Sequence, residues 1–190
     1  MVKGLYHHLR GAWKKPDSKV EQSRLIEWRA SEAVVVVDKP LRLDRARTVG
    51  YKAKKGIIVV RVRVKRGGRT RPRHKHGRKT RKQHVRKILK MNYRWVAEQR
   101  VQQKFPNLEI LNSYNLGKDG KHYFFEVILL DPEMPEIKND KVYSWITNPA
   151  NRSRVYRGLT SAAKKSRGLR SKSPNMKVRP SLRAWNRQGK

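Results

Sequence analysis

The sequence contains no cysteine. Disulfide bonds, thiolate zinc sites and cysteine nucleophiles are therefore all excluded. Secreted chains of this size usually carry disulfides, so the absence of cysteine favours an intracellular protein.

Long hydrophobic runs are also missing. The aliphatic runs, such as 34–37 and 57–60, have only about four residues each, whereas a helix needs about 20 apolar residues to span a bilayer. The first fifteen residues, MVKGLYHHLRGAWKK, are amphipathic and lack the continuous apolar stretch of a signal peptide. We therefore expect a soluble protein without a membrane partner.

Acidic residues are few and unevenly distributed. Fourteen Asp and Glu stand against 49 Lys and Arg, which gives a net charge of +35. All fourteen acids lie within 17–44 and 98–140, while residues 45–97 carry 21 basic side chains and residues 141–190 carry 14, both without an acid. A compact chain of this charge repels itself, and nucleic acid relieves the repulsion because each neutralised phosphate releases condensed counterions. The distribution predicts a folded body joined to acid-free parts that bind a polyanion.

Residue patterns predict an α+β fold, a small mixed α/β body with a long basic loop and a C-terminal extension. Helices are expected over 5–13, from an N-cap at Ser18 past Trp28, over 43–49, and from an N-cap at Asn92 to Lys104. Strands are expected over 33–37 (buried), 56–64, 108–116 and 123–130, the last two forming a hairpin around Asp119-Gly120. The predicted division is a body over 1–160, which contains a basic loop at about 66–90, and a basic extension over 161–190. The loop and the extension have too little apolar surface to fold alone, so we expect them to become ordered on binding.

The most basic tract is RVRVKRGGRTRPRHKHGRKTRK, residues 61–82, with twelve Lys or Arg, two His and no acid. Extended Arg and Lys side chains can follow closely spaced phosphates. A solvated charge run is the alternative, but the length of the tract and the charge of the whole chain favour phosphate binding. His74 and His76 make a poor metal site, because cations surround them and no Cys or acid is near.

No pattern indicates catalysis. The acids of DPEMPE, 131–136, are expected to set the geometry of a Pro-rich turn rather than to bind magnesium. Gly67-Gly68 lacks the spacing of a phosphate-cradling loop, and no nucleophile stands beside a base. We therefore expect neither an enzyme nor a cofactor, metal or small-molecule substrate.

Three aromatic residues, Tyr51, Tyr156 and Trp185, stand among cations and could stack on unpaired bases. For Tyr51 and Tyr156, base contact and packing in the core are equally open. The segment RGLTSAAKKSRGL, 157–169, places small residues among four cations, and we expect the small side chains to let the backbone approach phosphates.

Three segments together resemble one family: RLDRARTVGYKAKKGIIVVRVRVKRGGRTRP (42–72), NLEILNSYNLGKDGKHYFFEVILLDP (107–132) and RGLTSAAKKSRGL (157–169). They are similar, in sequence and in order, to the signature segments of the archaeal and eukaryotic type of large-ribosomal-subunit protein family fifteen, and the length suits the archaeal branch. The family usually has Trp in place of Asn115 and Gly-Arg in place of Ala163-Lys164. The resemblance implies an α+β body on large-subunit ribosomal RNA, neighbouring large-subunit proteins as further partners, a cytoplasmic, ribosome-bound location and no catalysis.

The resemblance also implies which cations face RNA. By position they are Arg42, Arg45, Arg47, Lys52, Lys54, Lys55, Arg61, Arg63, Lys65, Arg66, Arg69, Arg71, Arg73, Arg157, Lys164, Lys165, Arg167 and Arg170. The basic tract and the interleaved aromatics add Arg78, Lys79, Arg81, Lys82 and Tyr51 to these RNA-binding candidates. All of these cations except Arg42 also lie in the acid-free stretches.

Two other classes of protein are alternatives. An architectural DNA-binding protein could share the charge, but the sequence lacks the heptads or the recognition-helix pattern of such dimers. An enzyme acting on RNA would need a buried acid–base pair, for which the acids near Asp131 are the candidates.

Overall fold

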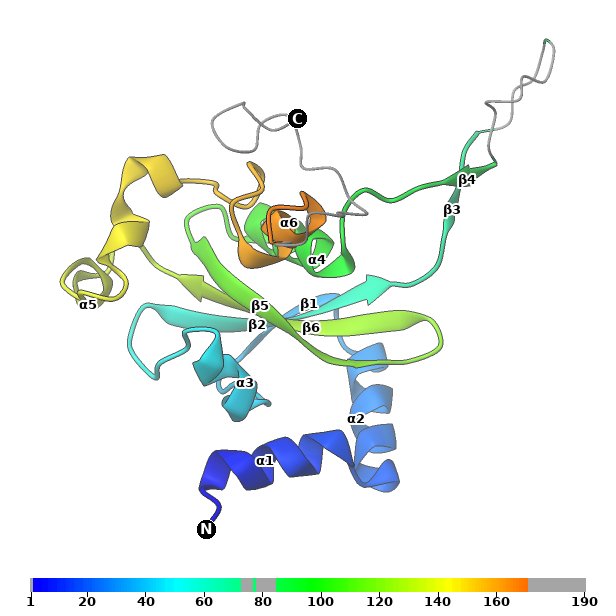
Figure 1. Ribbon diagram of the computed structural model, residues 1–190, viewed down its shortest axis with the longest axis horizontal. Coiled ribbons are helices and arrows are strands. Elements are labelled where there is room, and N and C mark those ends of the chain that lie inside the picture. The colour runs from blue at the N-terminus through cyan, green and yellow to red at the C-terminus, as the bar shows by residue number, and fades with distance from the viewer. Residues whose placement is uncertain (1, 73–76, 78–84, 171–190) are drawn as a thin grey trace.

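An antiparallel sheet with helices on both faces forms the centre of the protein (Figure 1). The computed structural model describes residues 2–72, 77 and 85–170. The elements in chain order are α1 (Leu5–Lys14), α2 (Ser18–Ala30), β1 (Val34–Val37), α3 (Leu43–Thr48), β2 (Ile57–Lys65), β3 (Arg69–Thr70), β4 (Arg86–Lys87), α4 (Tyr93–Lys104), β5 (Glu109–Lys118), β6 (His122–Leu130), α5 (Pro135–Lys138), the 3-10 turns η1 (Ser144–Thr147) and η2 (Pro149–Asn151), and α6 (Ser161–Ser166). The predicted α+β class is confirmed.

The sheet has the strand order β1-β2-β6-β5, and every neighbouring pair is antiparallel. β5 and β6 form the predicted hairpin, in which the Asp119 carboxylate accepts the amide of Lys121 at 2.7 Å and so fixes the turn. β2 pairs with β6 along its whole length, from Ile57 opposite Leu130 to Lys65 opposite His122. The two longest pairings, β2 with β6 and β5 with β6, therefore involve three of the predicted strands.

Hydrophobic clusters cover the two faces of the sheet. On one face Val60, Val62 and Val64 of β2 pack with Ala97 and Val101 of α4. The opposite face carries a second cluster, formed by Trp28 of α2, Ala46 of α3, and Val59, Phe124 and Ile128 of the strands. Because successive side chains of a strand point to opposite faces, β2 contributes to both clusters.

Two sequence predictions about the N-terminal half are wrong in detail. The N-cap of α2 is Asp17, whose carboxylate accepts the amide of Lys19 at 2.8 Å, and Ser18 is the first helical residue. An acidic cap also interacts favourably with the helix dipole. The strand β1 is half-buried rather than buried, with Val36 52% exposed, because β1 lies at the edge of the sheet. The N-cap at Asn92 is confirmed, since its side chain accepts the amide of Trp95 at 2.8 Å.

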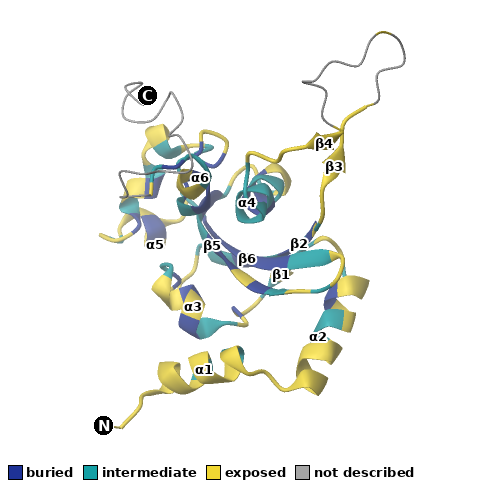
Figure 2. Cartoon of the chain, turned by 45° about the vertical axis from the view of Figure 1, so that its right-hand side comes forward, coloured by how far each residue is buried: buried dark blue, intermediate teal, exposed yellow. Residues whose placement is uncertain are grey.

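The basic loop leaves the body as a short two-stranded arm. Arg69 pairs with Lys87 and Thr70 with Arg86, and Figures 1 and 2 show this ladder projecting away from the sheet. At its base the Tyr93 hydroxyl donates to the Gly67 carbonyl at 2.8 Å. The arm is exposed on both strands, so its side chains stand in solvent. Among the helices of the described part, none is long and apolar enough to cross a bilayer.

Candidate nucleic-acid interface

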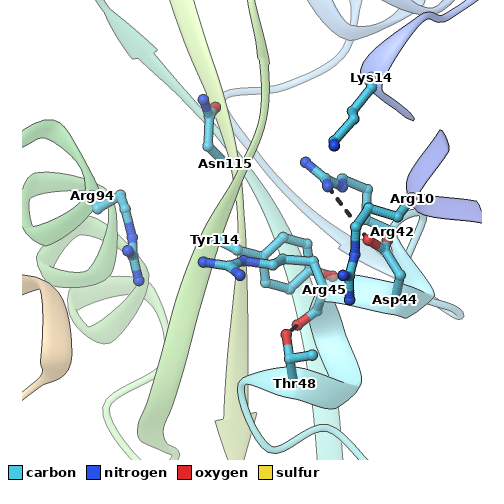
Figure 3. Close-up of a pocket in the computed structure, with 9 residues that line it drawn as sticks. All are labelled: Arg10, Lys14, Arg42, Asp44, Arg45, Thr48, Arg94, Tyr114 and Asn115. Atoms are coloured by element: carbon cyan, nitrogen blue, oxygen red, sulfur yellow. Dashed lines mark hydrogen bonds and ion pairs between the residues drawn. The ribbon is translucent and has the colours of Figure 1, made fainter. Parts of the chain in front are cut away.

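Two adjoining cavities open where α1, α3, the start of α4, β5 and α6 approach one another. The larger, of about 590 Å³, is drawn in Figure 3 and is lined by Arg10, Lys14, Arg42, Asp44, Arg45, Thr48, Arg94, Tyr114 and Asn115. The smaller, of about 400 Å³, is lined by Arg45, Thr48, Val49, Arg94, Asn112, Ser161, Lys165 and Arg170. They share Arg45, Thr48 and Arg94, so we treat them as one feature, the cationic groove. Its lining contains seven Lys or Arg and, among the described residues that form it, a single acid, Asp44.

Arg94 is the fixed cation at the centre of the groove. It lies in the first turn of α4, and its Nε donates to the Ser113 hydroxyl at 3.2 Å and its Nη2 to the Asn112 side-chain oxygen at 3.4 Å and to the Ser113 carbonyl. These bonds hold the half-buried guanidinium against β5. Burial lowers the pKa of Arg94, Glu98 opposes that shift, and the nearby charges of Arg45 and Arg170 lower it further.

Glu98 lies beneath Arg94 and joins three elements. It is fully buried, and its carboxylate accepts hydrogen bonds from the Ser113 hydroxyl on β5 and from the Thr160 hydroxyl before α6, the latter at 2.6 Å. Burial raises the pKa of Glu98, while these two bonds and the charges of Arg94 and Arg154 act in the opposite direction. A buried carboxylate is stable only with such partners, so this joint fixes α4, β5 and α6 relative to one another.

The outer wall of the groove is α1, whose ten residues include none that is buried. Trp13 contacts two guanidinium groups, with the Cζ atoms of Arg24 and Arg42 at 5.3 and 5.1 Å from its ring centre. Tyr6 accepts a hydrogen bond from Arg47 and also lies against its guanidinium. Cation–aromatic contacts therefore attach α1 to the body. In Figure 3 α1 presents Arg10 and Lys14 on one side, while Arg94 comes from α4 on the other.

Asp44 is already paired within the groove wall. It is 5% exposed, and its carboxylate lies 3.5 Å from Arg42. It thus neutralises one cation of the wall.

The cationic face of β2 is largely covered by α2 and by the β5–β6 turn. Arg61 donates to Glu27 and to the Ser31 hydroxyl at 3.4 and 3.3 Å and lies over the Trp28 ring, and Arg63 donates to the carbonyl of Arg29. Arg66 donates to the Asp119 carbonyl and lies 4.8 Å from the Tyr123 ring centre. Lys65 is exposed at the end of the strand. The structure thus assigns Arg61, Arg63 and Arg66 a packing role, and their contact with RNA stays a prediction.

The segment after α3 is similar. Lys52 lies 5.3 Å from the Tyr143 ring centre, and Lys54 forms an ion pair with Asp140. Both contacts attach this segment to the residues just before η1. Lys55 is exposed, and no contact of this kind ties it to the described residues. Tyr51 is 9% exposed within the cluster around Trp28. Of its two interpretations, core packing is the one its position favours, and stacking on a base would require it to leave that cluster.

Tyr156 has the opposite outcome. It is 49% exposed, so its interpretation as a core residue is wrong.

Trp185 lies outside the described residues, as do Arg73, Arg78, Lys79, Arg81, Lys82 and the histidines at 74 and 76. Arg69 and Arg71 are exposed on the arm.

The C-terminal motif divides its cations between two roles. Arg157 donates to the carbonyls of Ala150 and Arg152, and Arg167 donates to that of Gly158 at 3.0 Å. Lys164, Lys165 and Arg170 are exposed. The motif therefore carries both cations that shape the backbone and cations that face solvent.

The small residues of this motif face inward. Ala162 and Ala163 are 2% and 0% exposed, and α6 packs on α4 and β5. Their small side chains therefore bring α6 close to the body, and the approach of the segment's backbone to phosphate stays a prediction.

The turn after β6 is set by its acid, as expected. The Asp131 carboxylate accepts the amide of Glu133 at 3.0 Å, and no cluster of three His, Asp or Glu that could hold a metal occurs among the described residues.

Sequence reasoning selected Arg42, Arg45, Lys165 and Arg170 but missed three cations of the groove. Arg94 lies in the acid-free stretch 45–97 and could have been found there, although it falls on a helix with a mixed apolar face. Arg10 and Lys14 are one helical turn apart on α1, which was not recognised as part of a site.

Comparison with known proteins agrees with the segments that resembled one family. The family profile described as Ribosomal L15, of the L15e type, matches residues 4–185. Large ribosomal subunit protein eL15 of Methanocella arvoryzae is 48% identical over 196 residues, covering 100% of both chains. The protein of the same name from Methanospirillum hungatei is 47% identical over 190 residues, covering 97% of each chain. The chain therefore belongs to the Ribosomal L15 family, in its archaeal L15e type.

Proposed function

We propose that this chain is a structural constituent of the large ribosomal subunit, where it binds and stabilises folded ribosomal RNA by neutralising phosphates. The observation that carries the proposal is the cationic groove, to which five separate elements contribute and in which cations outnumber acids seven to one. Family membership and the names of both relatives support the same role. Neighbouring large-subunit proteins are the further partners, and the location is the ribosome in the cytoplasm.

Two kinds of cation perform this function. Arg94 and the covered arginines of β2 are held in place by protein contacts, so they give the body a fixed pattern of positive charge. The exposed cations of the arm and of 161–170 meet phosphates at the surface of the body, and we expect the basic loop and the extension to become ordered on binding RNA. We expect recognition of RNA shape and backbone, because side chains cannot enter the deep major groove of A-form RNA.

The candidate residues outside the groove belong to this proposal. Exposed Arg69, Arg71 and Lys65 extend the positive surface from the body along the arm. The division into a body over 1–160 and a basic extension over 161–190 stays a prediction, and α6, at the start of that extension, packs on α4 and β5.

Co-sedimentation tests the proposal. Purified chain is mixed with salt-washed archaeal large subunits depleted of their own copy, in magnesium, and pelleted with small subunits and with long duplex DNA as separate arms. We expect binding to the large subunit at about one copy each, resistance to washing at low salt and release at high salt. Comparable retention on duplex DNA or on small subunits would contradict a large-subunit role and favour general polyanion binding.

A further inference from the structure

The cationic groove contains like charges brought together without a matching acid. Arg45 comes from α3, Arg94 from α4 and Arg170 from the residues after α6, and all three line the smaller cavity. In the described part of the chain neither Arg45 nor Arg170 has an ion-pair partner. Glu98, the acid that faces Arg94, is fully buried and already accepts two hydroxyl hydrogen bonds. An anion that enters the groove would therefore relieve the repulsion among these guanidinium groups.

Arg94 is prepared to receive that anion. Its Nε and Nη2 are bound to β5, whereas its Nη1 has no hydrogen-bond partner among the residues that the structure describes. A guanidinium that is already fixed loses little conformational freedom when it binds a phosphate. In Figure 3 the Arg45 side chain extends from α3 toward the side on which Arg94 lies, and both residues line the smaller cavity.

The size and lining of the groove indicate the kind of anion. The two adjoining cavities, of about 590 and 400 Å³, are bounded at one end by Arg10 and Lys14 and at the other by Lys165 and Arg170. One phosphate ion would reach only part of this lining, but successive phosphates of one strand would reach both ends. The hydroxyls of Thr48 and Ser161 and the amide of Asn115 also line it and can bond sugar hydroxyls.

We propose that the cationic groove binds a single strand of RNA backbone, and that the bound strand holds α1 and the segment after α6 against the body. This inference rests on the proposed function, which supplies the RNA. α1 has no buried residue, and a free helix of ten residues is marginal in water. Phosphates that contact Arg10 and Lys14 therefore stabilise a helix that the protein alone secures through partly buried Trp13 and through the contact of Tyr6 with Arg47.

A matched pair of double variants tests the groove in the full-length chain. Arg45→Ala with Lys165→Ala removes two groove cations that make no side-chain hydrogen bond or ion pair with the described residues. Lys39→Ala with Lys118→Ala removes the same charge from two exposed positions outside the groove. Both pairs are compared with the unchanged chain for binding to a transcript of large-subunit ribosomal RNA across a series of salt concentrations.

The groove pair should lose two phosphate contacts. At 0.1 M salt a single-strand contact contributes about five-fold, since the logarithmic salt slope is about 0.7 per contact, so affinity should fall by about 25-fold and the slope by about 1.4. The control pair should remain close to the unchanged chain. Equal losses in the two pairs would overturn the groove proposal while leaving the proposed function standing, whereas salt-independent binding by the unchanged chain would remove the proposed function itself.

Hydrogen exchange of α1 gives the second readout. The RNA should protect the amides of residues 5–14 in the unchanged chain and in the control pair, and much less in the groove pair. Equal protection in all three would contradict a strand that bridges α1 to the body. Inorganic phosphate at the same phosphate concentration is the ion control. If phosphate alone fully protected α1, the groove would be a site for a free anion, and the proposal that it binds an RNA strand would be overturned.

Discussion

The substitution Thr160→Val tests the joint that positions α6. Thr160 is fully buried, its hydroxyl donates to the Glu98 carboxylate at 2.6 Å, and it accepts the amide of Ala163 at 3.4 Å as the N-cap of α6. Valine has nearly the same shape and tolerates the extended backbone at this position, φ −72° and ψ 161°. The change therefore removes the hydroxyl without adding strain or a large cavity.

The expected loss follows from two hydrogen bonds. A bond to a buried ionisable group contributes about 1.5–3 kcal/mol, and the long capping bond adds about 0.5–1 kcal/mol, at the low end for N-caps. Thr160→Val should therefore lower the free energy of unfolding by about 2–4 kcal/mol. Because α6 carries Lys165, the same variant should also bind RNA more weakly.

The assay is urea unfolding of the full-length chain at constant salt, followed by tryptophan fluorescence. Thr147→Val is the control, because its hydroxyl donates only to the Ser144 carbonyl three residues earlier, at 2.7 Å. A net loss of about 1 kcal/mol or less is expected for the control. If the two variants lose the same stability, or if Thr160→Val loses less than about 1 kcal/mol, the buried joint does not hold α6 as described.

Three further predictions concern buried acids and one glycine. Burial raises the pKa of Glu98, so its contribution to stability is greatest below the ordinary carboxyl range and is lost as pH rises through the folded-state pKa. Relative to Glu98→Gln, the unchanged chain should therefore become less stable in urea unfolding as pH increases from about 4.5, and a pH-independent difference would contradict the assignment. Tyr114→Phe removes the hydroxyl that donates to buried Glu126 and should cost about 1.5–3 kcal/mol. Tyr93→Phe, at a half-buried residue whose hydroxyl donates to the Gly67 carbonyl in an exposed hydrogen bond, should cost less in the same assay, and equal costs would contradict the buried pair. Gly158→Ala should cost about 1–2 kcal/mol from the left-handed backbone alone, since φ is +71° and the new methyl group would lie 2.8 Å from Cδ of Arg167. Gly120→Ala, which meets no atom within 4 Å, should be much milder, and equal melting temperatures for the two alanine variants would argue against this backbone.

Local sequence signals predicted most of the elements. Alternating valines and arginines identified β2, and Asp119-Gly120 identified the hairpin, because both patterns act within a few residues. The N-cap of α2 was misplaced by one position, since Asp17 and Ser18 are both good caps and only the backbone geometry decides between them.

Features that depend on tertiary packing could not be predicted from local sequence patterns. Alternation placed Arg61 and Arg63 on one face of β2, but it could not show that α2 covers that face. The half-buried state of β1 follows from its place at the edge of the sheet. Ala162 and Ala163 were interpreted as a surface motif because their neighbours are charged, whereas the packing of α6 on α4 and β5 buries them.

The sequence predicted some of the cations that belong to the candidate site, but it did not predict the groove in which they meet. The absence of acids selected Arg45, Lys165 and Arg170, all of which line the groove. Their convergence with Arg94 depends on how α3, α4 and α6 meet around β5, which no local pattern encodes.

The salt dependence of RNA binding tests the central claim most directly. Of the seven groove cations, only Arg42 is paired with an acid among the described residues. If the other six contact phosphates of one strand, the logarithm of the association constant should fall against the logarithm of salt concentration with a slope of at least about −4. A slope shallower than about −1 for the unchanged chain on large-subunit ribosomal RNA would show that phosphate neutralisation is not the source of its affinity.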